Sequence, residues 1–489
     1  MLFNSLDFAI FLPIVFFLYW FIFNRHLRLQ NLLIVVASFV FYGWWDWRFL
    51  LLMIITILLS WLSGIALRQI RTSKYVHESK RKLRLIAALN IIINLSILGY
   101  FKYYNFFIEN FVAAFSFFGK ELSTQSLNVI LPVGISFYTF QALSYTIDVY
   151  RKKIEATTDL ISFVAYVSFF PQLVAGPIER ATNLLPQFMR KRKFNYTMAT
   201  DGLRLILWGL FKKVVIADNC AEYANQIFNH SAEMNGSSLV LGALFFTVQI
   251  YGDFSGYSDI AIGTARLFGI NLMRNFAFPY FSRDIAEFWR RWHISLTTWF
   301  RDYLYIPLGG SRGSTWLKVR NTFIIFLVSG FWHGANWTFI VWGALNAVYF
   351  LPLLLTNNNR KNLGVTAEGK LLPGIRESFQ MLSTFALTVF AWIFFRAENL
   401  GHAFSYFREI FSPSLLQFPN FSGKTDVSIV ILFVFIFFLI EWIGRHGEFA
   451  IDQLGSDWKK PLRWGFYLII AIMIFLMGGE QQEFIYFQF

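Results

Sequence analysis

The chain carries its most informative stretch between Phe281 and Trp337, which reads FSRDIAEFWRRWHISLTTWFRDYLYIPLGGSRGSTWLKVRNTFIIFLVSGFWHGANW. A basic and aromatic segment with His293 is followed by a Gly-rich break, and then by an apolar run that contains His333. A polar side chain in such a run costs free energy at membrane depth unless it is paired or functional. Two histidines, each beside tryptophans, therefore suggest a reaction chamber inside a membrane.

The composition of the whole chain agrees with a membrane environment. Of its 489 residues, 56% are hydrophobic and only 15% are charged, with 60 Phe and 17 Trp. Several apolar runs approach the roughly 20 residues that cross a bilayer as a helix. They are Phe8 to Phe23, Phe49 to Leu67, Leu85 to Tyr100, Val427 to Ile443 and Trp464 to Met477. We predict an all-α polytopic membrane protein, with residues 1–489 forming a single transmembrane domain.

The net charge of +14 does not indicate nucleic acid, because Lys and Arg gather in short loops between the apolar runs. Such loops face the cytoplasm under the positive-inside rule. The basic segments after residue 24, at 68–84, at 151–153, at 357–376 and at 445–463 are therefore expected inside. Both chain termini are then expected outside. The single cysteine, Cys220, excludes an intramolecular disulfide and a cysteine metal cluster.

The middle of the chain does not fit a plain up-and-down bundle. Pro132, Gly134, Pro171 and Pro177 interrupt apolar runs, and the run from Asp159 to Gly176 has basic residues on both flanks. One simple crossing cannot satisfy both flanks, so we expect a re-entrant or in-plane helix there. We predict about eleven transmembrane helices plus such pieces, arranged around a central funnel or tunnel.

Each histidine has a functional and a structural interpretation. His333 is either a general base, since neutral imidazole titrates near physiological pH, or a histidine bonded between helices. Its neighbours Gly330, Gly334 and Ala335 allow close backbone approach. His293 shares a helix face with Trp289 and Thr297 if that segment is one helix. It then either stabilises an oxyanion or belongs to an interfacial helix.

Two further groups of polar residues stay ambiguous. Asp253 and Asp259 lie among small residues in YGDFSGYSDIAIG, and suit either a proton or cation path or hydrogen-bonded helix packing. The same two interpretations apply to Gln172, Glu179 and Arg180 in FPQLVAGPIER. The sequence has no HxxxH or carboxylate–histidine spacing, so no metal and no cofactor are predicted.

The last residues, FIYFQF from 484 to 489, form an aromatic tail on the predicted outer face. Such a tail is either an interfacial anchor or a carrier, because the Tyr486 phenol is a possible nucleophile or transient acyl acceptor.

Four motifs in order, VAGPIER, DFSGYSDIAIG, FWRRWHISLTTWFRDYLYIPLGG and SGFWHGANWTFIVWG, resemble the membrane-bound O-acyltransferase family. The resemblance is greatest to the bacterial branch typified by the membrane subunit of alginate O-acetylation, and it covers essentially the whole chain. It implies that His333 in WHGAN is the family's invariant histidine and that His293 in WHISL is its second conserved polar position. It also implies that Phe484, Tyr486 and Phe489 match an FxYxxF motif proposed to carry an acyl group on its tyrosine.

The resemblance implies a bacterial inner-membrane enzyme that takes acetyl from cytoplasmic acetyl-CoA and passes it across the membrane. The acceptor is an extracytoplasmic polysaccharide, commonly reached through a periplasmic SGNH-type acetyltransferase. We expect His333 to act as general base, His293 to hold the carbonyl and Tyr486 to be a possible acyl shuttle. Substrate contacts are expected from basic and aromatic residues around them: Trp289, Arg290, Arg291, Arg301, Trp332 and Asn336.

Other functions are compatible with the same sequence features. A transporter or flippase for a polysaccharide or lipid-linked glycan is the principal alternative, although no internal repeat supports it. A scaffold that only recruits a periplasmic enzyme would leave His333 dispensable. Within the acyltransferase interpretation, a lipid or protein acceptor and direct transfer to a partner without Tyr486 also stay open. The sequence does not identify the polymer.

Overall fold

The computed structural model describes residues 1–72, 76–117, 131–174, 176–478 and 482–485, and over these ranges it contains helices and no strands. By length and composition, six described helical segments could cross a bilayer, and Leu6–Ile22 and Leu27–Gly43 are shorter apolar helices. The prediction of an all-α polytopic membrane protein is confirmed. The count of about eleven spans stays a prediction.

Two compact units make up the chain, and each is described separately. The first comprises Met1–Ala199 and Thr264–Met273, and the second comprises Thr200–Gly263 and Arg274–Phe489. The prediction of one transmembrane domain over residues 1–489 stays a prediction.

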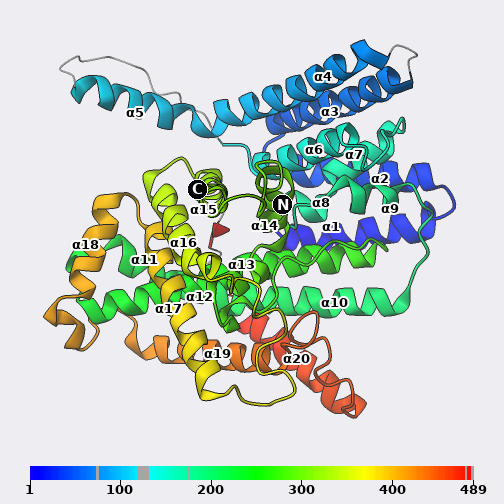
Figure 1. Ribbon diagram of the computed structural model, residues 1–489. Helices are drawn as coiled ribbons and strands as arrows, with labels where there is room; N and C mark the ends of the chain where they lie inside the picture. The colour runs from blue at the N-terminus through cyan, green and yellow to red at the C-terminus, as the bar shows by residue number, and fades with distance from the viewer. Residues whose placement is uncertain (73–75, 118–130, 175, 479–481, 486–489) are drawn as a thin grey trace. The chain divides into compact units, whose positions relative to one another are not determined.

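The first unit consists of helices, and its α-helices that follow α6 are shorter than the α-helices before it (Figure 1). They are α1 (Leu6–Phe17), η1 (Leu18–Ile22), α2 (Leu27–Gly43), α3 (Arg48–Thr72), α4 (Val76–Leu98), η2 (Gly99–Tyr103), α5 (Tyr104–Phe117), α6 (Ile135–Tyr150), α7 (Leu160–Ser168), α8 (Phe170–Leu173) and α9 (Ala181–Phe188).

The predicted interruptions lie where the first unit changes direction. Gly134 precedes α6 with a φ of 73°, and a Cβ there would lie 2.5 Å from the Leu173 carbonyl oxygen, so only glycine fits. The run from Asp159 to Gly176 forms α7 and α8, of nine and four residues. Neither is long enough to cross a bilayer alone, which agrees with the expectation that this run is not one simple crossing.

The second unit contains the remaining helices. They are α10 (Tyr196–Leu210), η3 (Phe211–Ala217), α11 (Asp218–Asn229), η4 (Ser231–Glu233), α12 (Gly236–Leu267), η5 (Pro279–Phe281), α13 (Ile285–Arg291), α14 (Ile294–Phe300), η6 (Arg301–Tyr305), α15 (Thr315–His333), α16 (Trp337–Leu355), α17 (Ile375–Arg396), α18 (Leu400–Ile410), η7 (Pro413–Leu416), α19 (Lys424–Ile443) and α20 (Lys460–Leu476). Helices α10 and α12 each have one end in the first unit. The most apolar window of α12 is 83% buried, against 39% or less for every other candidate span, so α12 is a core helix.

Helices α15 and α16 form a tight hairpin (Figure 1). A Cβ on Gly330 would collide with the carbonyl oxygen of Phe339, and one on Gly343 would collide with that of Phe326. Backbone therefore meets backbone at both glycines, as small residues allow between membrane helices. This close approach, expected for Gly330, fixes the position of the turn that joins the two helices.

Candidate functional site

His333 is the last residue of α15, and its side chain is buried at the turn into α16. Asn336 holds this turn from both sides. Its side-chain oxygen accepts the Thr338 N–H (3.0 Å) as the N-cap of α16, and its amide donates to the Glu398 carbonyl (2.8 Å). The predicted substrate-contacting residue Asn336 thus positions the backbone next to His333.

His293 lies between α13 and α14, not inside one helix. Its φ of 42° is left-handed, which is rare for a residue with a side chain and costs on the order of 1–3 kcal/mol. The expectation that Trp289, His293 and Thr297 share one helix face is therefore wrong.

Asn275 provides the physical reason for this break. Its carbonyl accepts the Ile294 N–H (2.9 Å), and its side-chain oxygen accepts the Ser295 hydroxyl (2.9 Å). Its amide also donates to the Ser258 hydroxyl on α12 (3.0 Å). Because Asn275 satisfies the backbone donors at the start of α14, the helix is interrupted at His293.

The two histidines meet in the second unit, 40 residues apart in sequence. Their ring centroids are 6.4 Å apart. Trp332 contacts both rings, at 6.1 Å from His293 and 5.0 Å from His333. The sequence-based grouping of His293, Trp332 and His333 is thus matched by their positions, while their roles stay predictions.

An aromatic enclosure surrounds the pair. His333 contacts the rings of Trp342 and Phe395, both at 5.2 Å, and Trp342 stacks on Trp392 at 5.7 Å. On the other side, Phe254 of α12 contacts the His293 ring edge-to-face at 4.6 Å. These rings come from α12, α16 and α17, so the enclosure is assembled from distant parts of the chain.

Burial in this enclosure decides the protonation state of His293, which lies outside the six candidate spans. Removal of the imidazole from water lowers the pKa of His293 to about 3. The ring is therefore neutral at physiological pH, with one ring N–H to donate and one nitrogen to accept. A neutral donor in a water-poor setting can stabilise a developing oxyanion.

Trp289 belongs to the same cluster through its indole. Its Nε1–H donates to the side-chain oxygen of Asn346 (3.2 Å), and its ring contacts Trp342 at 5.6 Å. The indole thus supports the ring that packs on His333, and its contact with the substrate stays a prediction.

The three arginines that are predicted to contact the substrate lie in two places. Arg290 donates to the carbonyls of Asn359 and Asn362, both at 2.8 Å, and Arg291 donates to that of Gly364 (2.9 Å). Arg301 is paired with Asp302 at 2.7 Å, and 55% of its side chain is exposed. The first two therefore hold the loop after α16, which borders a polar cavity of 360 Å³ that Arg283, Lys361 and Lys370 also line.

The described end of the C-terminal tail is fastened inside the second unit. The Ile485 N–H donates to Asp253 Oδ2 (2.7 Å), and Lys213 Nζ donates to the Gln482 carbonyl (3.2 Å). Lys213 also pairs with Asp253 and with Asp218, both at 2.8 Å. Two backbone groups of the tail are thus bonded to one buried ion cluster on α12 and η3.

Phe484 connects this tail to the histidine pair. Its ring is fully buried and packs on Tyr257 at 4.2 Å and on Phe254 at 6.2 Å. Phe254 in turn contacts His293. Tyr486 and Phe489 lie outside the described residues.

A protein-family model described as the membrane-bound O-acyltransferase family matches residues 39–390, which include both histidines and the enclosing rings of Phe254, Trp332 and Trp342. The chain belongs to the membrane-bound O-acyltransferase family. It is an acyltransferase, and the resemblance drawn from its motifs is confirmed.

Named relatives of this acyltransferase agree with the family assignment. A protein of Pseudomonas putida named "probable alginate O-acetylase" is 38% identical over 98% of both chains. One of Pseudomonas aeruginosa with the same name is 40% identical over 88% of this chain and 79% of its own. A peptidoglycan O-acetyltransferase of Helicobacter pylori is 32% identical over 98% of this chain and 95% of its own.

Sequence reasoning missed two parts of the acyltransferase site. The rings of Phe254, Trp342, Trp392 and Phe395 carried no signal, because aromatics make up 20% of the chain. The ion cluster did leave a signal, since Lys212 and Lys213 interrupt an otherwise apolar helical run. Lys212 pairs with Asp259 at 2.5 Å, so both ambiguous acids of α12 have lysine partners.

The other ambiguous polar group, in the first unit, has structural partners. Gln172 donates to the Tyr166 carbonyl (2.7 Å). Glu179 accepts from the side-chain amide of Asn183 (2.8 Å) and from the Met273 N–H. These contacts support the packing interpretation for Gln172 and Glu179.

Proposed function

We propose that this protein is a membrane O-acetyltransferase that takes acetyl from cytoplasmic acetyl-CoA and passes it across the membrane to an extracytoplasmic polysaccharide such as alginate. The observation that carries the proposal is the buried histidine pair, with its rings 6.4 Å apart, in a chain of the membrane-bound O-acyltransferase family. The printed names of the relatives support acetyl as the group and a bacterial envelope polymer as the acceptor class.

His333 acts as the general base in this proposal. Its neutral imidazole removes the proton of an attacking hydroxyl, and the hydroxyl oxygen forms a bond to the thioester carbonyl carbon. The carbon–sulfur bond then breaks, and the CoA sulfur leaves with the proton that His333 returns. A base of this kind typically contributes ~10²–10⁴-fold in rate.

His293 donates its ring N–H to the carbonyl oxygen as negative charge develops there. Its neutral state at physiological pH and its place beside Trp332 support this role. The helix break at His293, which Asn275 fixes, supports it too, because a donor that is already oriented needs no reorganisation during the reaction.

The donor enters a funnel from the cytoplasmic side, in the region of Arg290, Arg291 and Arg301. The basic residues around the loop after α16 support this direction, since CoA is anionic and positive loops face the cytoplasm. Trp289, Trp332 and Asn336 shape the path to the histidines, directly or through the residues they support.

The acceptor hydroxyl is that of Tyr486, which carries the acetyl group to a periplasmic SGNH-type acetyltransferase. The fastening of residues 482–485 supports this role, because Phe484 contacts Phe254, which in turn contacts His293. Direct transfer from the donor to the partner's acceptor is the second candidate. In this proposal the protein lies in the bacterial inner membrane, and both of its termini are extracytoplasmic.

Radiolabelled acetyl-CoA added to the purified protein in detergent tests the proposal. We expect label on the protein in wild type, and none in His333→Ala or Tyr486→Phe. Label that needs His333 but survives Tyr486→Phe would move the acceptor elsewhere. Wild-type labelling by His333→Ala would eliminate the assigned base.

Thioester hydrolysis separates the enzyme from a glycan transporter. A flippase needs no CoA ester, so the absence of both label and hydrolysis, even with glycan and partner present, would contradict the proposed O-acetyltransferase.

A further inference from the structure

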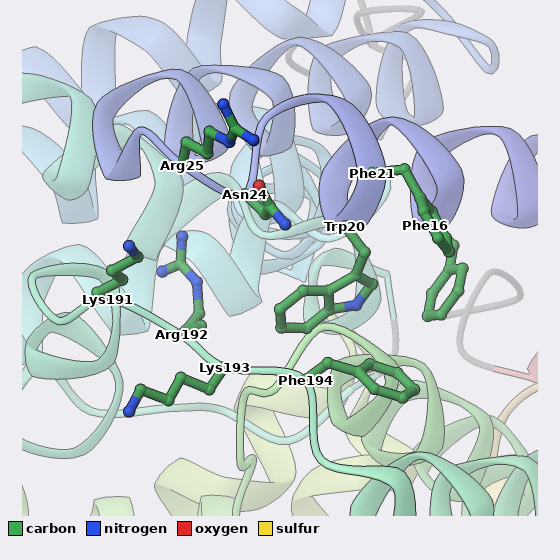
Figure 2. A pocket seen from close by; sticks show the side chains of 9 residues that line it. All are labelled: Phe16, Trp20, Phe21, Asn24, Arg25, Lys191, Arg192, Lys193 and Phe194. Carbon is green, nitrogen blue, oxygen red and sulfur yellow. The ribbon is translucent and has the colours of Figure 1, made fainter.

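The first unit contains a cavity of 530 Å³ whose lining separates charge from aromatic surface. Arg25, which follows η1, and Lys191, Arg192 and Lys193, which follow α9, supply its cations. Its rings include Trp20, Phe21 and Phe194. Figure 2 shows the Arg25, Lys191 and Lys193 side chains at one end of the cavity and the rings of Phe16 and Phe21 at the other. None of the lining residues is acidic.

Arg192 forms the fixed part of the cationic end. Its side chain is buried and donates to Asn31 Oδ1 (2.5 Å), to Gln30 Oε1 (3.3 Å) and to the Gln187 carbonyl (3.1 Å). All three acceptors are neutral oxygens, so these bonds orient the guanidinium without cancelling its charge. A buried cation without a carboxylate partner favours an anion beside it.

The other three cations surround Arg192 from exposed positions. Arg25, Lys191 and Lys193 are exposed, and none of them forms an ion pair with another described residue. Four positive charges thus lie around one cavity with no internal counterion. The chemistry that fits them is a phosphate group.

The aromatic end is suited to hydrocarbon. Trp20 is fixed by its Nε1–H bond to the Leu267 carbonyl (2.8 Å), and its ring meets that of Phe194 edge-to-face at 5.4 Å. Phe21 is 67% exposed and stacks at 5.1 Å on Phe17, which is 53% exposed. These exposed rings lie on the apolar helix α1–η1, where bilayer lipid is the expected neighbour.

We propose that this cavity binds an anionic phospholipid of the cytoplasmic leaflet, with the phosphate among the four cations and the acyl chains along Phe17, Phe21 and Phe194. Both basic segments are expected on the cytoplasmic side, where the leaflet is anionic. A soluble phosphate compound offers the same charge but leaves the exposed rings uncovered, so the cavity favours the lipid.

Native mass spectrometry of the delipidated full-length protein, with dioleoyl phosphatidylglycerol or dioleoyl phosphatidylcholine added, tests this site. We expect one tightly bound phosphatidylglycerol and no comparably retained phosphatidylcholine. Replacement of Arg25, Lys191 and Lys193 by Gln removes three charges while leaving the buried Arg192 network intact. Each charge is worth roughly fivefold in affinity, so the triple variant is expected to lose about 100-fold.

A matched control variant distinguishes a general effect of lost positive charge from the loss of this binding site. Lys459, Lys460 and Arg463 lie at the start of α20, in another segment that is predicted to be cytoplasmic, and their replacement by Gln changes the net charge equally. This control is expected to bind phosphatidylglycerol as wild type does. Equal binding by wild type and the Arg25, Lys191, Lys193 variant, or an equal loss in both variants, would overturn the site.

A second arm separates the lipid from a soluble phosphate. Glycerol 3-phosphate, inorganic phosphate and CoA are added in turn as competitors, and Phe194→Ala is compared with wild type. We expect no displacement by millimolar competitor and weaker lipid retention in Phe194→Ala. Displacement by one of these compounds, with Phe194→Ala unaffected, would assign the cavity to a soluble ligand and contradict the lipid.

Discussion

His293 is held in a left-handed backbone conformation by contacts that its own segment does not contain. Asn275 and Ser258 fix the break, and the aromatic rings around the imidazole keep it neutral. Strained residues that the surrounding structure holds in place cluster at functional sites. At the scale of one residue, the geometry thus favours a preorganised donor over an interfacial anchor.

Substitution of His293 distinguishes these roles. Asn tolerates positive φ and keeps an N–H donor, so His293→Asn is expected to retain a substantial part of kcat. His293→Ala removes the donor, and we expect kcat to fall about 10²-fold with KM little changed. Steady-state kinetics with acetyl-CoA give both parameters, and wild-type kcat in His293→Ala would contradict the oxyanion role.

The pH dependence of kcat gives a second test, which reports on the titration of His293 and not on its packing. A pKa of about 3 means that His293 is protonated only below that pH and does not titrate between pH 5 and 9. The acidic limb of kcat against pH is therefore expected at the same position in wild type and in His293→Asn. A shifted limb would show that His293 itself titrates in the active range.

At the scale of elements, the α15–α16 hairpin positions His333. Gly330 and Gly343 let the two backbones touch, and Asn336 caps the second helix. His333 lies three residues after Gly330, so a change in the helix crossing also displaces the imidazole.

Gly330→Ala tests this coupling. The added Cβ collides with the Phe339 carbonyl, and such overpacking typically costs about 1–3 kcal/mol. We expect a lower thermal midpoint in detergent and a lower kcat. Gly465→Ala on α20 is the matched control, because no atom lies within 4 Å of its Cβ and Ala favours the helix. Equal midpoints and activities for both variants would contradict the coupling.

At the scale of the whole molecule, the first and last parts of the second unit meet at Lys213. Its ammonium group pairs with two carboxylates and bonds to the tail, although Gln482 is 269 residues away. Asp253 adds the bond to Ile485. We interpret Lys213 and Asp253 as positioning residues, which act on the reaction only through the tail they hold.

Asp253→Asn and Asp259→Asn form a matched pair for this interpretation. Both remove a carboxylate of α12 that is paired with a lysine, and Asp253 is the one that accepts the Ile485 N–H. Asp253→Asn is expected to lower acetyl label on the tail by at least tenfold, an estimate from the loss of one charge-assisted bond. Hydrolysis of acetyl-CoA is expected to continue in the same variant.

Asp259→Asn is expected to keep both the label and the hydrolysis. Loss of label in both variants, or loss of hydrolysis together with label in Asp253→Asn, would indicate a purely structural cluster. The two readouts therefore separate positioning of the tail from the stability of the helix.

Local patterns in the sequence were sufficient to predict the class of fold and to name His293 and His333 as candidates. The apolar runs predicted membrane helices because hydrocarbon excludes unpaired backbone groups, and the prolines and glycines predicted the interrupted segments. Four motifs in order identified the acyltransferase family. Each of these signals lies within one short stretch of the chain, where sequence distance limits spatial distance.

Contacts between distant segments could be decided only by the tertiary structure. The break at His293 depends on Asn275 and Ser258, the enclosure of His333 depends on α16 and α17, and the tail depends on Lys213 and Asp253. Periodicity treated residues 289–297 as one helix because it does not register a side chain that competes for backbone donors from 20 residues away. The sequence therefore determined which residues are candidates for chemistry, and packing determined which of them meet, because burial and hydrogen bonding depend on neighbours in space.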